Sequence, residues 1–267
     1  MRSAVALLLL GWPLAAAAEP VVMLDPGHGG SNQGAFGPEA GRHEKQLTLE
    51  LARRCQLALR RLLPEARVVL TRGDDRYLTL AERVRRANSA RATLFVSLHL
   101  NASPSRSEQG FQTYVLSAEA SDREARRLAW RENRHDGPGH GGGGAAEGQA
   151  SDVDRRQDDL RAIVTEVRQR SAQRHAARLA AAIHRALTGL RGRERDRGLR
   201  QAPFDVLMGL EMPGVLVELG HIDHPVEGPE LARAETQTRL AEALASGIAR
   251  HVRGEGAAPG TRSRRAR

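Results

Sequence analysis

Short runs of aliphatic and β-branched residues alternate along the chain with segments whose apolar residues recur every three or four positions. The runs predict strands that are buried on both faces, and the helical spacing predicts amphipathic helices packed beside them. The expected strands are residues 21–24, 67–72, 93–98, 111–116 and 214–218, with 111–116 as a candidate edge strand. The expected helices are residues 44–62, 80–87, 122–132, 153–170, 171–190 and 231–252.

Strands that alternate with helices favour a single α/β domain with a mostly parallel, twisted sheet and helices on both faces. A helical insertion, residues 121–170, interrupts the alternation, and its middle, residues 135–151, is a Gly-rich run of low complexity. Ser171 is expected to cap a new helix after this insertion. Residues 191–198 are expected to form a loop.

The two ends of the chain differ in composition from the rest. Residues 1–18 have the parts of a secretory signal peptide, namely Arg2, the apolar run 4–10 and the small residues 15–18. We therefore expect an exported protein; the alternative, an uncleaved anchor, is disfavoured because no cationic flank follows the run. No later segment is apolar enough to span a bilayer, so none is expected in the mature protein. Residues 254–267 are basic, lack an apolar face and are expected to be disordered.

The charge balance is basic, with 41 Lys and Arg against 32 Asp and Glu and a formal net charge of +9. Lys45 is the only lysine, so nearly all of this charge is carried by arginine. Such a surface favours polyanions. Nucleic acid is disfavoured by the export signal and by an aromatic content of 3%, which leaves few platforms for base stacking. Cys55 is the only cysteine, so no internal disulfide is expected.

Potential metal ligands stand at the ends of the hydrophobic runs. His28 follows the first strand, His99 ends the strand at 93–98, Glu218 ends the last strand, and Glu44 opens the first helix. Because ligands bind outside the carboxyl ends of parallel strands, these side chains are expected on one rim of the sheet. Two imidazoles and a carboxylate, with a fourth position left for water, form the ligand set of a hydrolytic zinc site.

Five stretches give the chain a resemblance to a known family: Leu24-Asp25-Pro26-Gly27-His28-Gly29-Gly30, Glu44-Lys45, Ser97-Leu98-His99-Leu100-Asn101-Ala102, Gln201-Ala202-Pro203-Phe204-Asp205-Val206-Leu207 and Met212-Pro213-Gly214-Val215-Leu216-Val217-Glu218. In this order they resemble the zinc-dependent N-acetylmuramoyl-L-alanine amidases of the amidase 3 family, over about residues 21–252. The resemblance implies that residues 19–253 form a zinc amidase catalytic domain that acts on peptidoglycan in the periplasm or cell wall.

The resemblance also assigns roles. It implies that His28, Glu44 and His99 bind one zinc ion per chain and that Glu218 is the catalytic carboxylate. Asn101 either contacts substrate or holds its own loop, and Asp25 is a candidate to orient the His28 loop.

Several alternatives stay open. His28 and His99 could instead be hydrogen-bonded core residues that bind no metal. Glu218 could be a solvated acid without a catalytic role. His43 could bind the metal in place of Glu44. The chain departs from the usual family pattern at Asn32, where Asp is common. It departs again at residues 221–224, whose two histidines, His221 and His224, raise the prospect of a second metal.

Three functions compete on these observations. The first is a zinc amidase that cuts the bond between N-acetylmuramic acid and L-alanine, in wall turnover or daughter-cell separation. The second is a zinc peptidase acting on stem peptides, disfavoured because no His-Glu-x-x-His helix is found. The third is a non-catalytic wall-binding regulator, which would be favoured by loss of Glu218 or of a ligand, and neither is lost.

The insertion at 121–170 has a functional and a neutral interpretation. Some relatives in the family carry a helical insertion here that covers the zinc and is displaced by a protein activator. On this interpretation Glu132 or Glu166 is the candidate group that occupies the open zinc position. The alternative is a tolerated surface insertion, because long loops cost little free energy.

Overall fold

The computed structural model describes residues 19–134 and 152–255, except for the side chains of residues 152–169. The expected signal peptide, the Gly-rich run and residues 256–267 lie outside the described residues. Among the described helices, none is long and apolar enough to cross a membrane.

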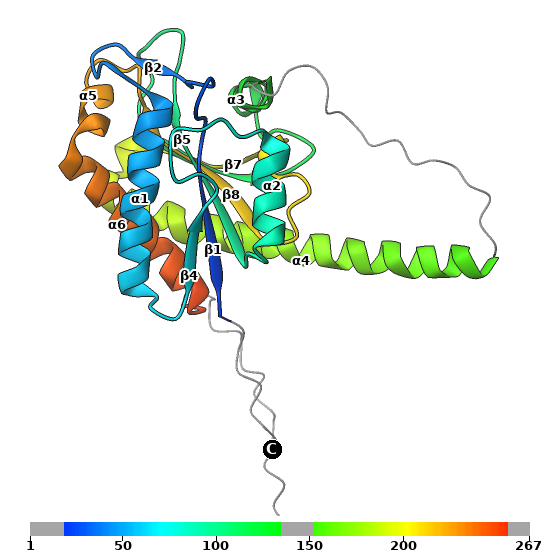
Figure 1. The fold of residues 1–267 in the computed structure, drawn as a ribbon. Helices are drawn as coiled ribbons and strands as arrows, with labels where there is room; N and C mark the ends of the chain where they lie inside the picture. The colour runs from blue at the N-terminus through cyan, green and yellow to red at the C-terminus, as the bar shows by residue number, and fades with distance from the viewer. Residues whose placement is uncertain (1–18, 135–151, 256–267) are drawn as a thin grey trace, which may run out of the picture.

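A six-stranded sheet forms the centre of the domain, with strand order β4-β1-β5-β8-β6-β7 (Figure 1). Its strands are β1 (Val21–Pro26), β4 (Arg67–Leu70), β5 (Leu94–Asn101), β6 (Phe111–Leu116), β7 (Asp196–Ala202) and β8 (Gly214–His221). All neighbouring pairs are parallel except β6 and β8. A short antiparallel pair, β2 (Phe36–Gly37) and β3 (Arg42–His43), precedes the first helix. The expected α/β class with a mostly parallel sheet is confirmed.

Helices cover both faces of the sheet. They are α1 (Glu44–Leu62), α2 (Leu80–Ser89), α3 (Arg123–Asn133), α4 (Asp152–Arg191), α5 (Glu227–Ala232) and α6 (Ala234–Val252). Buried apolar residues of α1, α6 and the second half of α4 pack on one face of the sheet, and those of α2 and α3 pack on the other with Phe204 and Leu207. The first part of α4 projects beyond the sheet (Figure 1).

Three expectations about the elements are wrong. Strand β6 is internal, because β7 pairs with its outer side and forms the edge in a segment expected to be a loop. β7 reads Asp-Arg-Gly-Leu-Arg-Gln-Ala and is mostly half-buried, and it has no hydrophobic run that would mark it in the sequence. Ser171 does not begin a helix but lies inside the 40-residue α4. No proline or glycine interrupts α4 near Ser171, so good helix formers carry the helix through it.

Candidate functional site

The carboxyl end of β1 leads into the loop that presents His28. This residue has a φ of 60°, a left-handed conformation that is uncommon outside glycine and is often found at functional sites. A Cβ on the preceding Gly27 would lie 2.5 Å from the His99 ring, so only glycine allows β1 and β5 to bring the two imidazoles together. The rings of His28 and His99 meet edge to face, with centroids 4.9 Å apart. Asn32 Oδ1 lies 3.0 Å from His28 Nδ1, which leaves Nε2 directed at the site.

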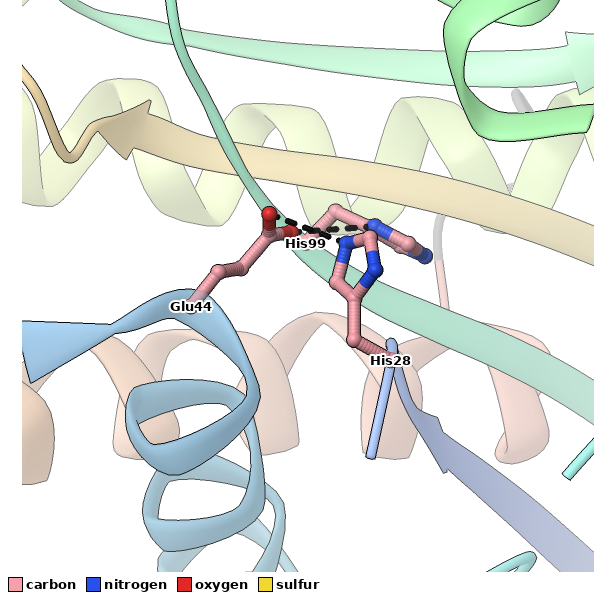
Figure 2. A group of neighbouring side chains, drawn as sticks. All are labelled: His28, Glu44 and His99. Atoms are coloured by element: carbon pink, nitrogen blue, oxygen red, sulfur yellow. Dashed lines mark hydrogen bonds and ion pairs between the residues drawn. The ribbon is translucent and has the colours of Figure 1, made fainter. Parts of the chain in front are cut away.

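Glu44, the first residue of α1, faces both imidazoles (Figure 2). Its Oε2 lies 2.9 Å from His28 Nε2, and its Oε1 lies 3.1 Å from His99 Nδ1. The backbone N–H groups of Ala35 and Leu100 donate to the same two oxygens at 3.0 and 2.9 Å and fix the carboxylate. Burial opposes ionisation, but His28 and His99 hold the pKa of Glu44 well below its usual value. Burial likewise opposes protonation of His28, yet Glu44 raises the His28 pKa.

Glu218 stands next to His99, because the two residues pair in register between β8 and β5. Its side chain is wholly buried, and neither carboxylate oxygen has a hydrogen-bond partner among the described residues. Burial raises the pKa of Glu218 well above its usual value, and the charges of Glu132 and Glu44 raise it further. A buried carboxyl without a partner is costly, so its retention here is a signal of function.

The last turn of α3 places Glu132 over the two histidines. Glu132 Oε2 lies 3.5 Å from His28 Nε2 and 3.4 Å from His99 Nδ1, and the residue is buried. Burial raises its pKa, but the two histidines and Arg131 outweigh this and lower it. Glu166 is the other candidate to occupy the open zinc position, and its side chain lies outside the described residues.

Arg131, the neighbour of Glu132, holds this turn against β5. Its Nη2 donates to Asn101 Oδ1 at 3.0 Å, and its Nη1 donates to the carbonyl of Ala102 at 2.8 Å. Asn101 also donates from its own side chain toward Gln112 at 3.5 Å and accepts from the Ala102 N–H at 2.8 Å. Asn101 therefore hydrogen-bonds both to its own loop and to Arg131 of α3.

Two groups of described side chains could hold a metal ion. His28, Glu44 and His99 are one, and His99, Glu132 and Glu218 are the other; in each, one ligand atom per residue lies within 4.8 Å of the rest. Two imidazole nitrogens and a carboxylate oxygen converging on one point suit a divalent cation of the zinc class. Such an ion would have Glu218 beside it, an arrangement suited to hydrolysis.

The other histidines considered as ligands lie elsewhere. The His43 ring packs 4.8 Å from the ring of Phe36, and the residue caps α1. His221 is buried, and burial lowers its pKa to about 4. His224 Nδ1 accepts from the backbone N–H groups of Val226 and Glu227 at the start of α5. None of the three belongs to a metal-capable group among the described residues.

Two buried arginines that the sequence analysis missed hold the His28 loop. Arg83 donates to the carbonyls of Pro26 and His28 at 2.8 and 2.7 Å. Arg72 donates to the carbonyl of Gly27 at 2.7 Å and to that of Lys45, in the first turn of α1, at 2.9 Å. The sequence signal was weak, because charged residues after a strand or on a helix are common at the surface.

Asp25 balances the charge of Arg83 under the site. Its carboxylate accepts from Arg83 and Ser97 at 2.7 Å each and from Thr71 at 2.5 Å. Burial opposes the charge, but Arg83 and the two hydroxyls lower the Asp25 pKa. The candidate role of Asp25 in orienting the His28 loop would act through Arg83.

Asp25→Asn should lower the free energy of unfolding by about 3–5 kcal/mol, because it leaves Arg83 buried without a counter-charge. The pKa of Asp25 is lower in the folded than in the unfolded state. The stabilisation by the Asp25 carboxylate is therefore fully present above about pH 4, the pKa of an unperturbed Asp, and is lost as the pH falls through the lower pKa of the folded protein. Urea unfolding between pH 7 and pH 3 measures it, with the exposed Asp74→Asn as control. Equal losses of unfolding free energy in the Asp25→Asn and Asp74→Asn variants would contradict the role given to Asp25.

Comparisons with known proteins show the family to which this chain is similar. The family model described as N-acetylmuramoyl-L-alanine amidase matches residues 22–250. The amidase AmiC of Neisseria meningitidis is 31% identical over 87% of this chain and 53% of its own length. The amidase AmiA of Escherichia coli K12 is 32% identical over 85% of this chain and 74% of its own. The chain thus spans about half the length of the AmiC relatives, 53% and 52% for two of them.

Solved structures of amidases also resemble this chain in fold. The amidase AmiC2 of Nostoc punctiforme superimposes with a TM-score of 0.62 at 25% identity, covering 89% of this chain and 99% of that one. The catalytic domain of the amidase CwlV from Paenibacillus polymyxa superimposes with a TM-score of 0.61 at 27% identity, covering 88% and 98%. With the family model matching most of its length, the chain belongs to the N-acetylmuramoyl-L-alanine amidase family, amidase 3.

Proposed function

We propose that this protein hydrolyses the amide bond between N-acetylmuramic acid and L-alanine in peptidoglycan. The observation that carries the proposal is the buried, unpartnered carboxylate of Glu218 beside the cluster of His28, Glu44 and His99. Export to the periplasm or cell wall, for turnover or cell separation, is part of the proposal and rests on residues 1–18. The products released from purified peptidoglycan test it directly.

The donor set fits one zinc ion, which His28, His99 and Glu44 would hold through two imidazole nitrogens and a carboxylate oxygen. When bound, zinc supplies Lewis-acid chemistry, polarising the amide carbonyl and acidifying water. The chain's own contribution is position: Asn32 orients the His28 ring, and two backbone N–H groups hold the Glu44 carboxylate. Such supporting hydrogen bonds set the orientation and basicity of metal ligands.

Glu218 is the proposed proton carrier. One of its carboxylate oxygens takes a proton from the attacking water and passes it to the departing amide nitrogen, as a general base and then a general acid. No described side chain donates to either oxygen, so both are available to the reactants. A peptidase acting on stem peptides would use the same chemistry, and only the position of the cut bond separates the two.

We further propose that the structure represents a closed, autoinhibited state. Glu132 Oε2 lies within 3.5 Å of both histidine nitrogens, where the substrate carbonyl or water would have to stand. Its second oxygen accepts from Arg131 Nε at 3.0 Å, so the carboxylate is held in place. A surface insertion without function has no need to bury an acid at this point.

The part of α3 that could move is its last turn. Ala125, Leu128 and Ala129 on the same helix are buried in the core with Tyr114 and Phe204. Moving the whole helix would expose this apolar surface, at about 25 cal/mol for each Å². For the same reason, deleting residues 122–170 would open the core and is a poor test of autoinhibition.

The contacts that hold the last turn are fewer and polar. Besides the bonds of Arg131 to β5, Asn133 donates to the carbonyl of Pro203 at 2.8 Å and accepts from the Asp205 N–H at 3.0 Å. Exchanging a few hydrogen bonds for water costs about 0.5–1.5 kcal/mol each. A protein activator that binds this turn could supply that free energy, and we propose such a partner.

Glu132→Ala should raise basal hydrolysis of peptidoglycan several-fold without changing the zinc content, because it frees the position over the histidines. Dye release from labelled peptidoglycan and metal analysis of the purified protein measure the two quantities. Glu119→Ala, which removes an exposed acid just before α3, is the matched control and should behave as wild type. Unchanged activity in a folded, zinc-loaded Glu132→Ala protein would contradict autoinhibition.

A further inference from the structure

Helix α3 has two opposite faces. The inner face carries Ala125, Leu128, Ala129 and Glu132, all buried. The outer face, spaced at three and four residues, is exposed and consists of Arg123, Arg126, Arg127, Trp130 and Arg134. We call these five residues the α3 outer face. It contains no acidic residue.

The charge of the α3 outer face is not neutralised by the rest of the domain. The two acids of α3 point elsewhere: Glu124 accepts from Gln112, Arg197 and Arg200, and Glu132 faces the histidines. None of the four guanidiniums has a carboxylate partner among the side chains that the structure describes. Some other exposed arginines do, such as Arg61 with Glu242 and Arg76 with Asp74. The face is therefore a local excess of positive charge.

An aromatic ring lies in the middle of this charge. Trp130 is 61% exposed, and Arg134 stacks over its ring at 4.3 Å from the centroid. Phe36 and Tyr77 are the other exposed aromatic residues among those described, at 48% and 37%, so Trp130 has the largest exposed fraction. Tryptophan and arginine are among the side chains that most often dominate binding surfaces. Tryptophan gives a large contact with few rotamers to fix, and arginine presents five N–H donors in a planar fork.

We propose that the α3 outer face binds peptidoglycan strands next to the active site, with arginines on stem-peptide carboxylates and Trp130 on the apolar face of a sugar ring. This rests on the proposed function, which makes peptidoglycan the polymer at this rim. The guanidinium fork matches a carboxylate bidentately, and the four cations of the face are all arginines. Since Glu132 lies on the opposite face of the same helix, the α3 outer face is separated from the proposed cleavage site by the width of that helix.

Two other occupants fit the face less well. A helix that lies on a membrane needs a broad exposed apolar face, and the apolar face of α3 is buried in the core, leaving only Trp130. A stable protein interface needs a packed apolar centre, which one tryptophan does not supply. A charged polymer bound by several weak contacts requires neither.

The test is co-sedimentation of the full-length protein with insoluble peptidoglycan, in a Glu218→Gln background so that the polymer stays intact. The triple variant R123Q/R126Q/R127Q should bind about ten-fold more weakly, given about 0.2–1 kcal/mol for each exposed charge contact. The matched control R174Q/R178Q/R185Q removes the same charge from exposed positions on α4 and should change binding by less than about two-fold.

Trp130→Ala is a second arm with a different salt dependence. It should weaken binding at low and at high salt, because stacking is not screened, whereas the difference between the arginine triple variant and its control should vanish near 1 M salt. Equal losses in the two triple variants would overturn the proposal, since net charge alone would then explain binding. Loss of binding to anionic phospholipid vesicles with unchanged binding to peptidoglycan would also overturn it.

Failure of this proposal can be told apart from failure of the proposed function. With Glu218 intact, the control R174Q/R178Q/R185Q should cleave a small soluble muramoyl-peptide at the wild-type rate. If the zinc-loaded Glu132→Ala protein does not cut that amide bond, the amidase proposal fails. If it cuts the bond but the triple variant sediments like its control, only the binding surface fails.

Discussion

Replacing Glu218 with glutamine should lower kcat for amide hydrolysis about 1,000-fold, the usual scale of a positioned general acid or base, while the zinc content stays near one per chain. Glutamine keeps the size of the side chain at this fully buried position but cannot take a proton. KM should change little, because the substrate contacts remain. Rates are best measured in the Glu132→Ala background, where the proposed block is removed.

The exposed Glu65→Gln is the control for Glu218 and should leave kcat unchanged. Thermal unfolding shows whether the Glu218→Gln protein is folded. Its Tm should be close to that of wild type, because glutamine fills the same volume and replaces one buried polar group without a partner by another. A rate within a few-fold of wild type in folded Glu218→Gln protein would remove Glu218 from the mechanism.

His28→Ala and His99→Ala should each lose zinc and hydrolysis together, because each removes one of three proposed ligands. Activity should fall to the level of the wild-type protein after chelation, and adding zinc should restore the wild type but neither variant. Metal analysis after dialysis, paired with rate measurements, checks both quantities on the same samples.

His175→Ala is the control for the metal variants. His175 is exposed on α4 with its ring 6.4 Å from that of His251, far along the chain from the cluster. It should retain zinc and activity. Full activity of either ligand variant without bound metal, or of the chelated wild type, would contradict the zinc proposal.

The positions of the four main site residues could be anticipated because each sits at a feature that sequence marks well. His28, His99 and Glu218 each end or follow a hydrophobic run, and parallel strands bring such ends to one rim. Glu44 opens a helix with clear periodicity. The structure brings these residues together at the carboxyl edge, and Glu132 arrives there from the insertion.

What could not be anticipated depends on contacts between distant segments. Arg72 and Arg83 are buried because carbonyls of the His28 loop accept from them, and no local pattern shows that. Strand β7 is defined by pairing with β6, not by its own apolar residues. The buried inner face of α3 likewise appears only once Phe204 packs against it. Sequence patterns locate elements with strong periodicity, and tertiary contacts decide the rest.

Mass spectrometry of the products released from purified peptidoglycan tests the central claim most directly. The account predicts free stem peptides that begin with an L-alanine amino group, together with glycan strands whose N-acetylmuramic acid carries a free lactyl carboxylate. Both products should be absent with the Glu218→Gln protein. Cuts within the stem peptide with the lactyl amide intact, or no new products from zinc-loaded Glu132→Ala protein, would contradict the account.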